Sequence, residues 1–234
     1  MNMERRHWLS RVTPSADLKY RQLVHDIGGL DPYEQHQTLW KLFSVAREER
    51  TERAEFLYRA EEKNGLPMFY VLSRRQPLDP SGLWQVESKV YAPNIQVGDR
   101  LAFKLRVNPT VARSNAKGES SRRHDVVMDA KRRLGWKELP EESRPSLAQV
   151  AYEAGACWLL HREERLGYTI DSTTLRVDGY RTWRQRGRKG IELSMLDFEG
   201  TLLVSDQTKA MEALTCGVGR GKSFGCGLLL VRRL

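Results

Sequence analysis

Residues 216–234 read Cys216-Gly217-Val218-Gly219-Arg220-Gly221-Lys222-Ser223-Phe224-Gly225-Cys226-Gly227-Leu228-Leu229-Leu230-Val231-Arg232-Arg233-Leu234. Five glycines and two cations come first, and an apolar run typical of a strand follows them. Glycine lets the backbone adopt positive φ and approach a ligand closely. Successive exposed N–H groups form a concavity that binds anions. We therefore predict a phosphate-binding loop between a helix and a final strand. Its expected contacts are Gly219, Arg220, Gly221, Lys222 and Ser223.

This loop does not match the two common nucleotide-binding patterns. A Walker A loop has four residues between its first Gly and the Gly-Lys-Ser, whereas three separate Gly217 from Gly221. It also follows a strand and opens a helix, which is the reverse of the order expected here. The dinucleotide pattern fails because Phe224 occupies its third glycine position. ATP and NAD are therefore disfavoured, no nucleotide cofactor is expected, and a nucleic-acid backbone is the better candidate. A simple glycine-rich turn stays open as an alternative.

The composition favours a polyanionic partner. The chain has 234 residues, enough for one large domain or two small ones. Its 39 Lys and Arg outnumber its 30 Asp and Glu, which gives a net charge of +9. Cations gathered on one face release counterions from phosphates, so this excess points to nucleic acid. Solubility alone is the competing explanation.

The cysteines and the N-terminal residues predict a soluble, cytoplasmic protein. Cys157, Cys216 and Cys226 have no CxxC spacing, which fits reduced thiols better than a disulfide framework or a zinc site. The first residues contain no apolar signal core. No apolar run approaches the length needed to span a membrane, so no membrane partner is expected.

Hydrophobic spacing predicts an α+β chain. In its second half the expected order is strand, helix, strand, strand, helix, strand, which is the ferredoxin-like pattern. In the first half a second helix is not evident. Residues 111–125 are basic, contain Gly and Ser, and read as a linker or a mobile loop. The expected helices are 31–45, 146–162 and 207–214, and the expected strands are 7–12, 54–59, 68–73, 84–91, 100–107, 168–177, 191–204 and the last residues.

The first expected helix carries the candidate for acid–base chemistry. Asp31 can cap it, and Glu34 completes a capping box. Tyr33 and His36 are three residues apart and therefore share a face. A neutral histidine beside a phosphate at a helix N-terminus can act as a general base. The other interpretation is a histidine at the edge of the core with a tyrosine packed beside it.

The sequence has no cluster with the spacing of metal ligands, so no metal or other cofactor is expected. If the protein is a nuclease, this favours RNA, because the 2′-OH of RNA can attack the adjacent phosphate and DNA lacks that group. A basic segment at residues 181–190 includes Arg184, Arg186 and Arg188 and could read a groove. A solvated basic hairpin is the alternative, as it is for Arg122 and Arg123.

Three separated segments resemble, in order, the CasE family, the CRISPR repeat endoribonucleases of the type I-E Cascade complex. They read Asp31-Pro32-Tyr33-Glu34-Gln35-His36-Gln37-Thr38-Leu39-Trp40, then Phe103-Lys104-Leu105-Arg106-Val107-Asn108-Pro109, then residues 217–229. The resemblance runs from about Trp8 to the last residues and is loose over residues 112–182. Three motifs in order are far more specific than any one of them.

The resemblance implies two tandem ferredoxin-like, or RRM-like, domains. Residues 1–109 would carry the catalytic histidine, and residues 110–234 the basic hairpin and the glycine-rich RNA-binding loop. The implied activity is metal-independent cleavage of CRISPR precursor RNA 3′ of each repeat hairpin. Attack by the 2′-OH would leave a 2′,3′-cyclic phosphate or a 3′-phosphate. The implied partners are the repeat hairpin, retained as the mature guide RNA, and the other subunits of Cascade, an antiviral complex.

The family's catalytic residues fall on His36 and Tyr33, while Lys41 matches an assisting lysine only approximately. The RNA-facing loop of the family matches the segment with Arg220 and Lys222. The rival interpretation is a non-catalytic RNA-binding module with tandem RRM-like folds. Such modules stack bases on sheet aromatics, and the strand at residues 100–107 offers Phe103 alone, on its apolar face.

Overall fold

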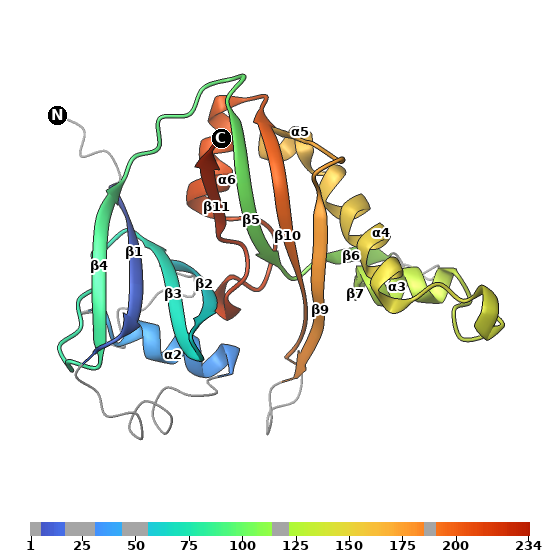
Figure 1. Cartoon of the computed structure of the whole chain (residues 1–234), viewed down its shortest axis with the longest axis horizontal. Helices are drawn as coiled ribbons and strands as arrows, with labels where there is room; N and C mark the ends of the chain where they lie inside the picture. Colours follow the sequence, from blue (N-terminus) through green and yellow to red (C-terminus); the bar gives the residue numbers. More distant parts are fainter. Residues whose placement is uncertain (1–5, 17–30, 44–55, 114–121, 185–190) are drawn as a thin grey trace. The chain divides into compact units, whose positions relative to one another are not determined.

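The computed structural model describes residues 6–16, 31–43, 56–113, 122–184 and 191–234 (Figure 1). The chain forms two compact units, and neither is a continuous stretch. The first unit consists of Met1–Asn94, Thr215–Gly217 and Gly221–Leu228. The second consists of Ile95–Leu214, Val218–Arg220 and Leu229–Leu234.

The first unit is a four-stranded antiparallel sheet with the order β2-β3-β1-β4. In the described part of the chain, helix α2 lies between β1 and β2, and this strand order is that of a ferredoxin-like domain. The connection from β3 to β4, residues 74–83, contains no helix, and no second helix is evident in the sequence of this half. The elements are β1 (His7–Pro14), α2 (Pro32–Trp40), β2 (Phe56–Lys63), β3 (Leu66–Ser73) and β4 (Trp84–Tyr91).

Helix α2 begins as predicted and ends earlier than predicted. Asp31 accepts hydrogen bonds from the backbone N–H groups of Tyr33 and Glu34, and Glu34 closes the capping box. The helix ends at Trp40, where successive N–H groups bond three residues back and tighten the last turn. The carbonyl of Leu42 then accepts from the N–H of Leu78, which fixes the exit of the chain.

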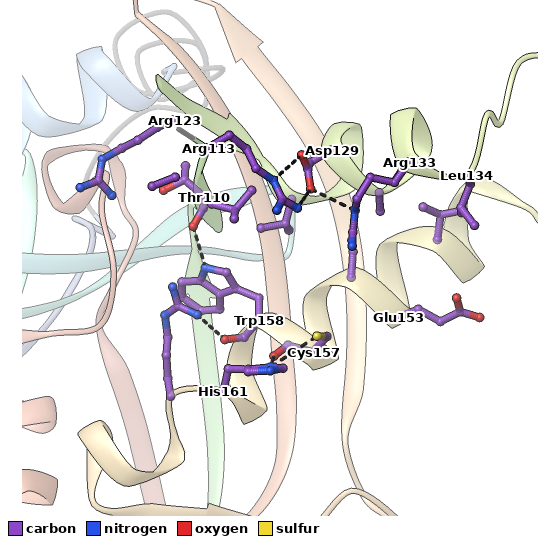
Figure 2. Close-up of a pocket in the computed structure, with 17 residues that line it drawn as sticks. Thr110, Arg113, Arg123, Asp129, Arg133, Leu134, Glu153, Cys157, Trp158 and His161 are labelled. Atoms are coloured by element: carbon purple, nitrogen blue, oxygen red, sulfur yellow. Dashed lines mark hydrogen bonds and ion pairs between the residues drawn. The ribbon is translucent and has the colours of Figure 1, made fainter. Parts of the chain in front are cut away.

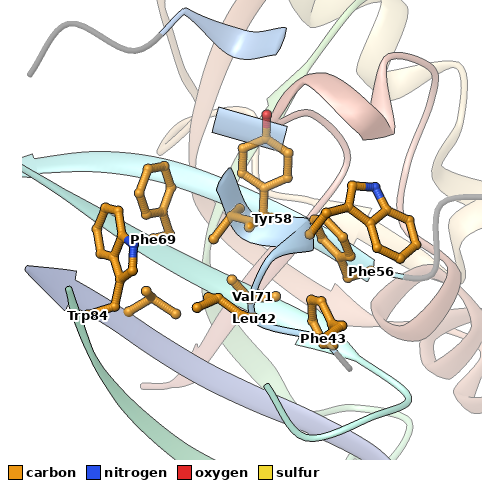
Figure 3. Packing of buried hydrophobic residues seen from close by; sticks show 10 residues of the cluster. Leu42, Phe43, Phe56, Tyr58, Phe69, Val71 and Trp84 are labelled. Carbon is orange, nitrogen blue, oxygen red and sulfur yellow. The ribbon is translucent and has the colours of Figure 1, made fainter. Parts of the chain in front are cut away.

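Aromatic side chains from α2 and the sheet form the core of the first unit (Figure 3). Tyr58 contacts Phe56 on the same strand, β2, and Phe69 on β3, and Phe69 meets Trp84 edge to face at a centroid distance of 5.7 Å. Fully burying one such side chain contributes about 1.5–3 kcal/mol. This core holds α2 on the sheet, because Leu39, Trp40 and Phe43 are part of it.

The second unit repeats the ferredoxin-like order in a larger form. Its sheet runs β11-β5-β10-β8, and β9 also pairs with β10. Read along the chain, β5, α4, β9, β10, α6 and β11 give strand, helix, strand, strand, helix, strand. The elements are β5 (Arg100–Val107), α4 (Leu147–Leu160), β8 (Tyr168–Ile170), β9 (Arg176–Arg184), β10 (Glu192–Val204), α6 (Gln207–Cys216) and β11 (Leu229–Arg233).

The first unit gives way to the second between Asn94 and Ile95, and not after residue 109 as expected. Strand β5 therefore belongs to the second unit. The strand alternates as predicted, and its apolar residues Leu101, Phe103 and Leu105 are buried. It pairs with β10 on one side and with β11 on the other. Strand β5 is therefore a central strand of the second sheet, and both of its partners lie far along the sequence.

Residues 111–125 are not simply a linker. Strand β6 (Thr110–Arg113) pairs with β7 (Arg122–Asp125), and α3 (Val126–Arg133) follows directly. Asp125 caps α3 by accepting from the N–H groups of Val127 and Met128. Residues 114–121 lie outside the described part of the chain. The remaining elements of the described residues are a short helix, α5 (Glu163–Leu166), and two 3-10 turns, η2 (Glu141–Ser143) and η3 (Lys222–Phe224).

The expected strand at residues 168–177 is two strands. Asp171 accepts from the backbone N–H and the hydroxyl of Thr173, which forms a turn between β8 and β9. Helix α4 packs tightly on the sheet: a Cβ added at Gly155 would lie 2.8 Å from a methyl of Val177. Among the described residues, no helix has both the length and the apolar character needed to cross a membrane.

Candidate functional site

His36 lies in the middle of α2 and is half-buried among aromatic rings. The indole Nε1–H of Trp40 donates a hydrogen bond to His36 Nε2 over 3.1 Å. The imidazole also lies against Phe56, with centroids 5.3 Å apart, and stacks on Tyr58 at 6.4 Å. The ring is therefore contacted both along its edge and on its face, so its orientation is defined before any ligand binds.

Tyr33 and Lys41 take different positions relative to His36. Tyr33 is half-buried in the first turn of α2, three residues before His36, so the two share a face as predicted. Lys41 is the exposed C-cap, five residues after His36. At 3.6 residues per turn this places it roughly 140° around the helix from His36.

The turn η3 of the glycine-rich loop packs against α2 and β2 within the first unit. It lies between Gly221 and Gly225, which both adopt the left-handed conformation. A Cβ added at Gly225 would lie 3.1 Å from a ring carbon of Tyr58. Glycine is needed here because the backbone passes directly over the tyrosine that stacks on His36. The structure therefore brings Lys222 and Ser223 to the helix that carries His36.

The polar groups of this turn already have partners within the protein. The ammonium of Lys222 donates to the carbonyl of Cys216 over 2.5 Å, at the C-terminus of α6. The backbone N–H groups of Phe224 and Cys226 both donate to the carbonyl of Gly221. These two N–H groups are therefore directed into the turn, while the predicted anion contacts of Gly219 to Ser223 stay a prediction.

Gly219 and Arg220 belong to the second unit. Arg220 is exposed and forms a backbone bridge with Asn108, just beyond β5. Gly219 adopts a φ of 77°, and a Cβ at this position would contact the ring of Trp158 at 3.4 Å. The backbone of Arg220 is thus paired with that of Asn108, while its side chain is exposed.

The basic hairpin is described only in part. Arg184 ends β9, and its exposed side chain pairs with Glu192 on β10 at 3.1 Å. Arg186 and Arg188 lie outside the described residues, as does the side chain of Arg122. The groove-reading role predicted for Arg184, Arg186 and Arg188 therefore stays a prediction, as does the RNA contact of Arg122.

Arg123 lines a cavity of about 660 Å³ between the β6–β7 hairpin and helices α3 and α4 (Figure 2). On one wall Asp129 accepts a bidentate pair of hydrogen bonds from Arg113 and an ion pair from Arg133. The hydrogen bond from Arg113 is the largest cause of a lowered pKa of Asp129. Arg113 and Arg133 thus share one carboxylate, and Arg123 is a further exposed cation of the cavity.

Sequence reasoning missed the aromatic frame of His36. The spacing of His36 and Trp40, four residues apart on a helix, was a usable signal. This spacing was not used in the prediction, and Trp40 is also part of the aromatic core. Phe56 and Tyr58 had no such signal, because their contacts with His36 depend on how β2 lies against α2. Among the described residues, no group of three His, Cys, Asp or Glu side chains could hold a metal ion.

The rival interpretation, a non-catalytic RRM-like module, requires exposed aromatic rings on the sheet, and on β5 the candidate is Phe103. Phe103 is 4% exposed and lies in the core of the second unit. A ring in that position is covered by the protein and offers no face to a base. The strand therefore lacks the exposed aromatic platform on which RRM modules stack RNA.

Comparison with known proteins identifies relatives along nearly the whole chain. The sequence is 31% identical over 232 residues to the CRISPR-associated endoribonuclease Cse3 of Thermus thermophilus. This alignment covers 96% of this chain and 99% of that protein. It is 28% identical over 209 residues to the CRISPR system Cascade subunit CasE of Escherichia coli, covering 85% and 90%.

Solved structures agree with this relationship. The structure of Thermus thermophilus Cse3 bound to an RNA representing a pre-cleavage complex matches with a TM-score of 0.66 at 28% identity, and the match covers 97% of this chain and 99% of that one. The crystal structure of Cas6e from Escherichia coli has a TM-score of 0.62 at 22% identity and so supports the fold. The sequence model of the family described as "CRISPR associated protein" matches residues 7–233. The chain therefore belongs to this family of CRISPR-associated proteins.

Proposed function

We propose that this protein is an endoribonuclease that cleaves CRISPR precursor RNA 3′ of each repeat hairpin. The observation that carries the proposal is the setting of His36. It lies on a capped helix, its orientation is defined by Trp40 and Tyr58, and η3 packs beside it. The class of substrate, CRISPR precursor RNA, is inferred from the similarity of the sequence to a CRISPR-associated endoribonuclease.

The proposed reaction needs one nucleophile from the RNA and one proton acceptor from the protein. His36 takes the proton from the 2′-OH on the 5′ side of the scissile phosphate. The 2′-oxygen then bonds to phosphorus, the bond from phosphorus to the 5′-oxygen breaks, and the leaving oxygen takes up a proton. The products are a 2′,3′-cyclic phosphate and a 5′-hydroxyl. Tyr33 shares the face of His36 and is proposed to orient the phosphate with its hydroxyl.

The RNA is proposed to bind through cations in both units. Arg220 is exposed and suited to a phosphate contact. Lys222 can contact a phosphate only by leaving the carbonyl of Cys216, so its contribution to affinity is reduced by the bond that it gives up. Ser223, Arg123 and Arg184 are further proposed contacts.

The same proposal includes a place in a complex. A relative is a subunit of the Cascade complex, and we propose that this protein likewise keeps its product and joins other Cascade subunits in the cytoplasm. A nuclease that holds its product turns over slowly, so its rate is best measured with enzyme in excess over RNA.

The decisive experiment is cleavage of a repeat hairpin by His36→Ala. General acid–base catalysis contributes about 10²–10⁴-fold, so single-turnover cleavage should fall by that factor while hairpin affinity stays within a few-fold. Tyr33→Phe removes one hydroxyl from the same face and should cause a smaller but measurable loss. Cleavage by His36→Ala at the wild-type rate would refute the assignment.

A further inference from the structure

We infer that Trp40 is a positioning residue that fixes the protonation site and the orientation of His36 through the hydrogen bond from its indole N–H to Nε2. The inference rests on the proposed function in so far as His36 is the catalytic residue. Beyond the proposed function, the inference specifies which nitrogen of the His36 ring exchanges the proton. It also specifies that Trp40 keeps this nitrogen unprotonated in the resting protein.

The donor and acceptor roles in this pair follow from chemistry. Indole Nε1–H can only donate a hydrogen bond, and it lies 3.1 Å from Nε2 of His36. Nε2 must therefore hold a lone pair and no proton. In a neutral imidazole one nitrogen carries the proton, so the proton lies on Nδ1. The hydrogen bond to one ring nitrogen sets the tautomer of the ring.

The aromatic contacts of His36 with Phe56 and Tyr58 do not provide this selection. Phe56 and Tyr58 lie against the imidazole at 5.3 and 6.4 Å between centroids. Such packing limits where the ring can be, but an aromatic face does not distinguish nitrogen from carbon along the edge of its neighbour. The N–H of Trp40 does, because it gains a hydrogen bond in one orientation of the ring and loses it when the ring flips.

Trp40 is itself rigidly held. Its side chain is 5% exposed, and it meets Phe43 and Phe56 edge to face at 6.3 and 5.3 Å. It lies in the last turn of α2, four residues after His36, so the helix fixes the separation of the two residues. A donor held in this way is preorganised, which is what a supporting residue of a catalytic group requires.

The tautomer determines the path of the proton during cleavage. Because Nδ1 already carries a proton, the ring can accept the proton of the 2′-OH only at Nε2, and Trp40 has to release that nitrogen as the new N–H bond forms. The imidazolium then has N–H groups at both positions and cannot accept from Trp40. The indole therefore disfavours the imidazolium and favours passing its Nε2 proton to the leaving 5′-oxygen, which restores the resting pair.

The test removes the indole N–H while keeping an aromatic ring. Trp40→Phe retains packing against Phe43 and Phe56 and loses the bond to His36. Trp136→Phe is the matched control, because the indole of Trp136 donates to the carbonyl of Pro145 at 2.8 Å in the second unit. Thermal unfolding of both variants measures the cost of losing one indole hydrogen bond.

The first measurement is the tautomer of His36 by ¹⁵N NMR of the free, histidine-labelled protein. It is made near pH 9, where imidazole is about fully neutral. The His36 signals are identified by their absence in His36→Asn. We expect the Nδ1–H form in the wild type and in Trp136→Phe, and a shift towards the Nε2–H form in Trp40→Phe. A wild-type ring in the Nε2–H form overturns the inference without any variant.

The second measurement is single-turnover cleavage of a repeat hairpin. A misplaced catalytic group costs up to about 10²-fold, so Trp40→Phe should cleave roughly ten- to a hundredfold more slowly with its hairpin affinity nearly unchanged. Trp136→Phe should cleave normally. A changed tautomer with an unchanged rate would overturn the positioning role. If His36→Ala cleaves normally, the proposed function fails, while the tautomer result stands independently.

Discussion

The hydroxyl of Tyr58 donates a hydrogen bond to the backbone carbonyl of Pro32 over 2.9 Å. The two residues are 26 positions apart in the sequence, and the bond ties strand β2 to the first residue of α2. The ring of the same tyrosine stacks on His36. One side chain therefore fixes the start of the helix and covers a face of its histidine.

Tyr58→Phe separates these two contributions. The variant keeps the stacked ring and loses a hydrogen bond worth about 1 kcal/mol. For a chain of this size that loss lowers the melting temperature by about 2–4 °C. Tyr91→Phe is a suitable control, since the Tyr91 hydroxyl has no hydrogen-bond partner among the described residues. An equal melting temperature for the wild type and Tyr58→Phe would show that the anchoring bond contributes nothing.

Cleavage should survive an excess of EDTA and should fail on a modified RNA. The proposed reaction uses His36 and the 2′-OH of the RNA, so a single 2′-deoxy substitution on the 5′ side of the scissile phosphate should abolish it. Gel analysis of both reactions, with the unmodified hairpin as the control, is sufficient. Activity that is lost in EDTA and restored by Mg²⁺ would indicate a metal-dependent nuclease and contradict the proposal.

Arg220→Ala should weaken RNA binding alike for different stems, because an exposed cation contacts phosphate rather than bases. One lost phosphate contact lowers the slope of log K against log salt by about 0.7–0.9. Lys222→Ala should have a smaller effect on this slope, since Lys222 already donates to the carbonyl of Cys216. Binding curves at several salt concentrations compare the two variants, and a larger change for Lys222→Ala would reverse their proposed roles.

Alanine at Arg184, together with Arg186 and Arg188, should reduce the discrimination between the cognate hairpin and one with exchanged stem pairs. A base contact is worth about 1–3 kcal/mol on the scale known for DNA. Arg184 has to give up its exposed pair with Glu192 to contact RNA, and exposed pairs are worth little. Affinities for the two hairpins test this prediction. Equal weakening of both would make the hairpin a general electrostatic surface.

Patterns within a few neighbouring residues were sufficient to predict several helices and strands. Asp31 and Glu34 predicted the start of α2 because a capping box needs only neighbouring residues. The alternation of Leu101, Phe103 and Leu105 predicted β5, since one face of a strand is buried. Such signals act within a few residues, and they were confirmed.

Features that depend on distant residues were not predicted. The boundary between the units was placed after residue 109, because nothing within β5 indicates that β10 and β11 are its partners. In the candidate site, the spacing of Tyr33 and His36 predicted that they share a helix face, whereas the contact of Tyr58 with His36 depends on the packing of β2 against α2. The inward bond of Lys222 depends on how the glycine-rich turn meets α6.

The divided first unit has a consequence for synthesis on the ribosome. Helix α2 and strand β2 are made early, but the segment Gly221–Leu228 that packs against them is translated only after residues 95–214. At the usual speed of about 5–20 residues per second this delay is on the order of ten seconds. Nascent chains that stop before this segment therefore lack the turn that packs against α2, and the site is completed only after residues 221–228 have been made.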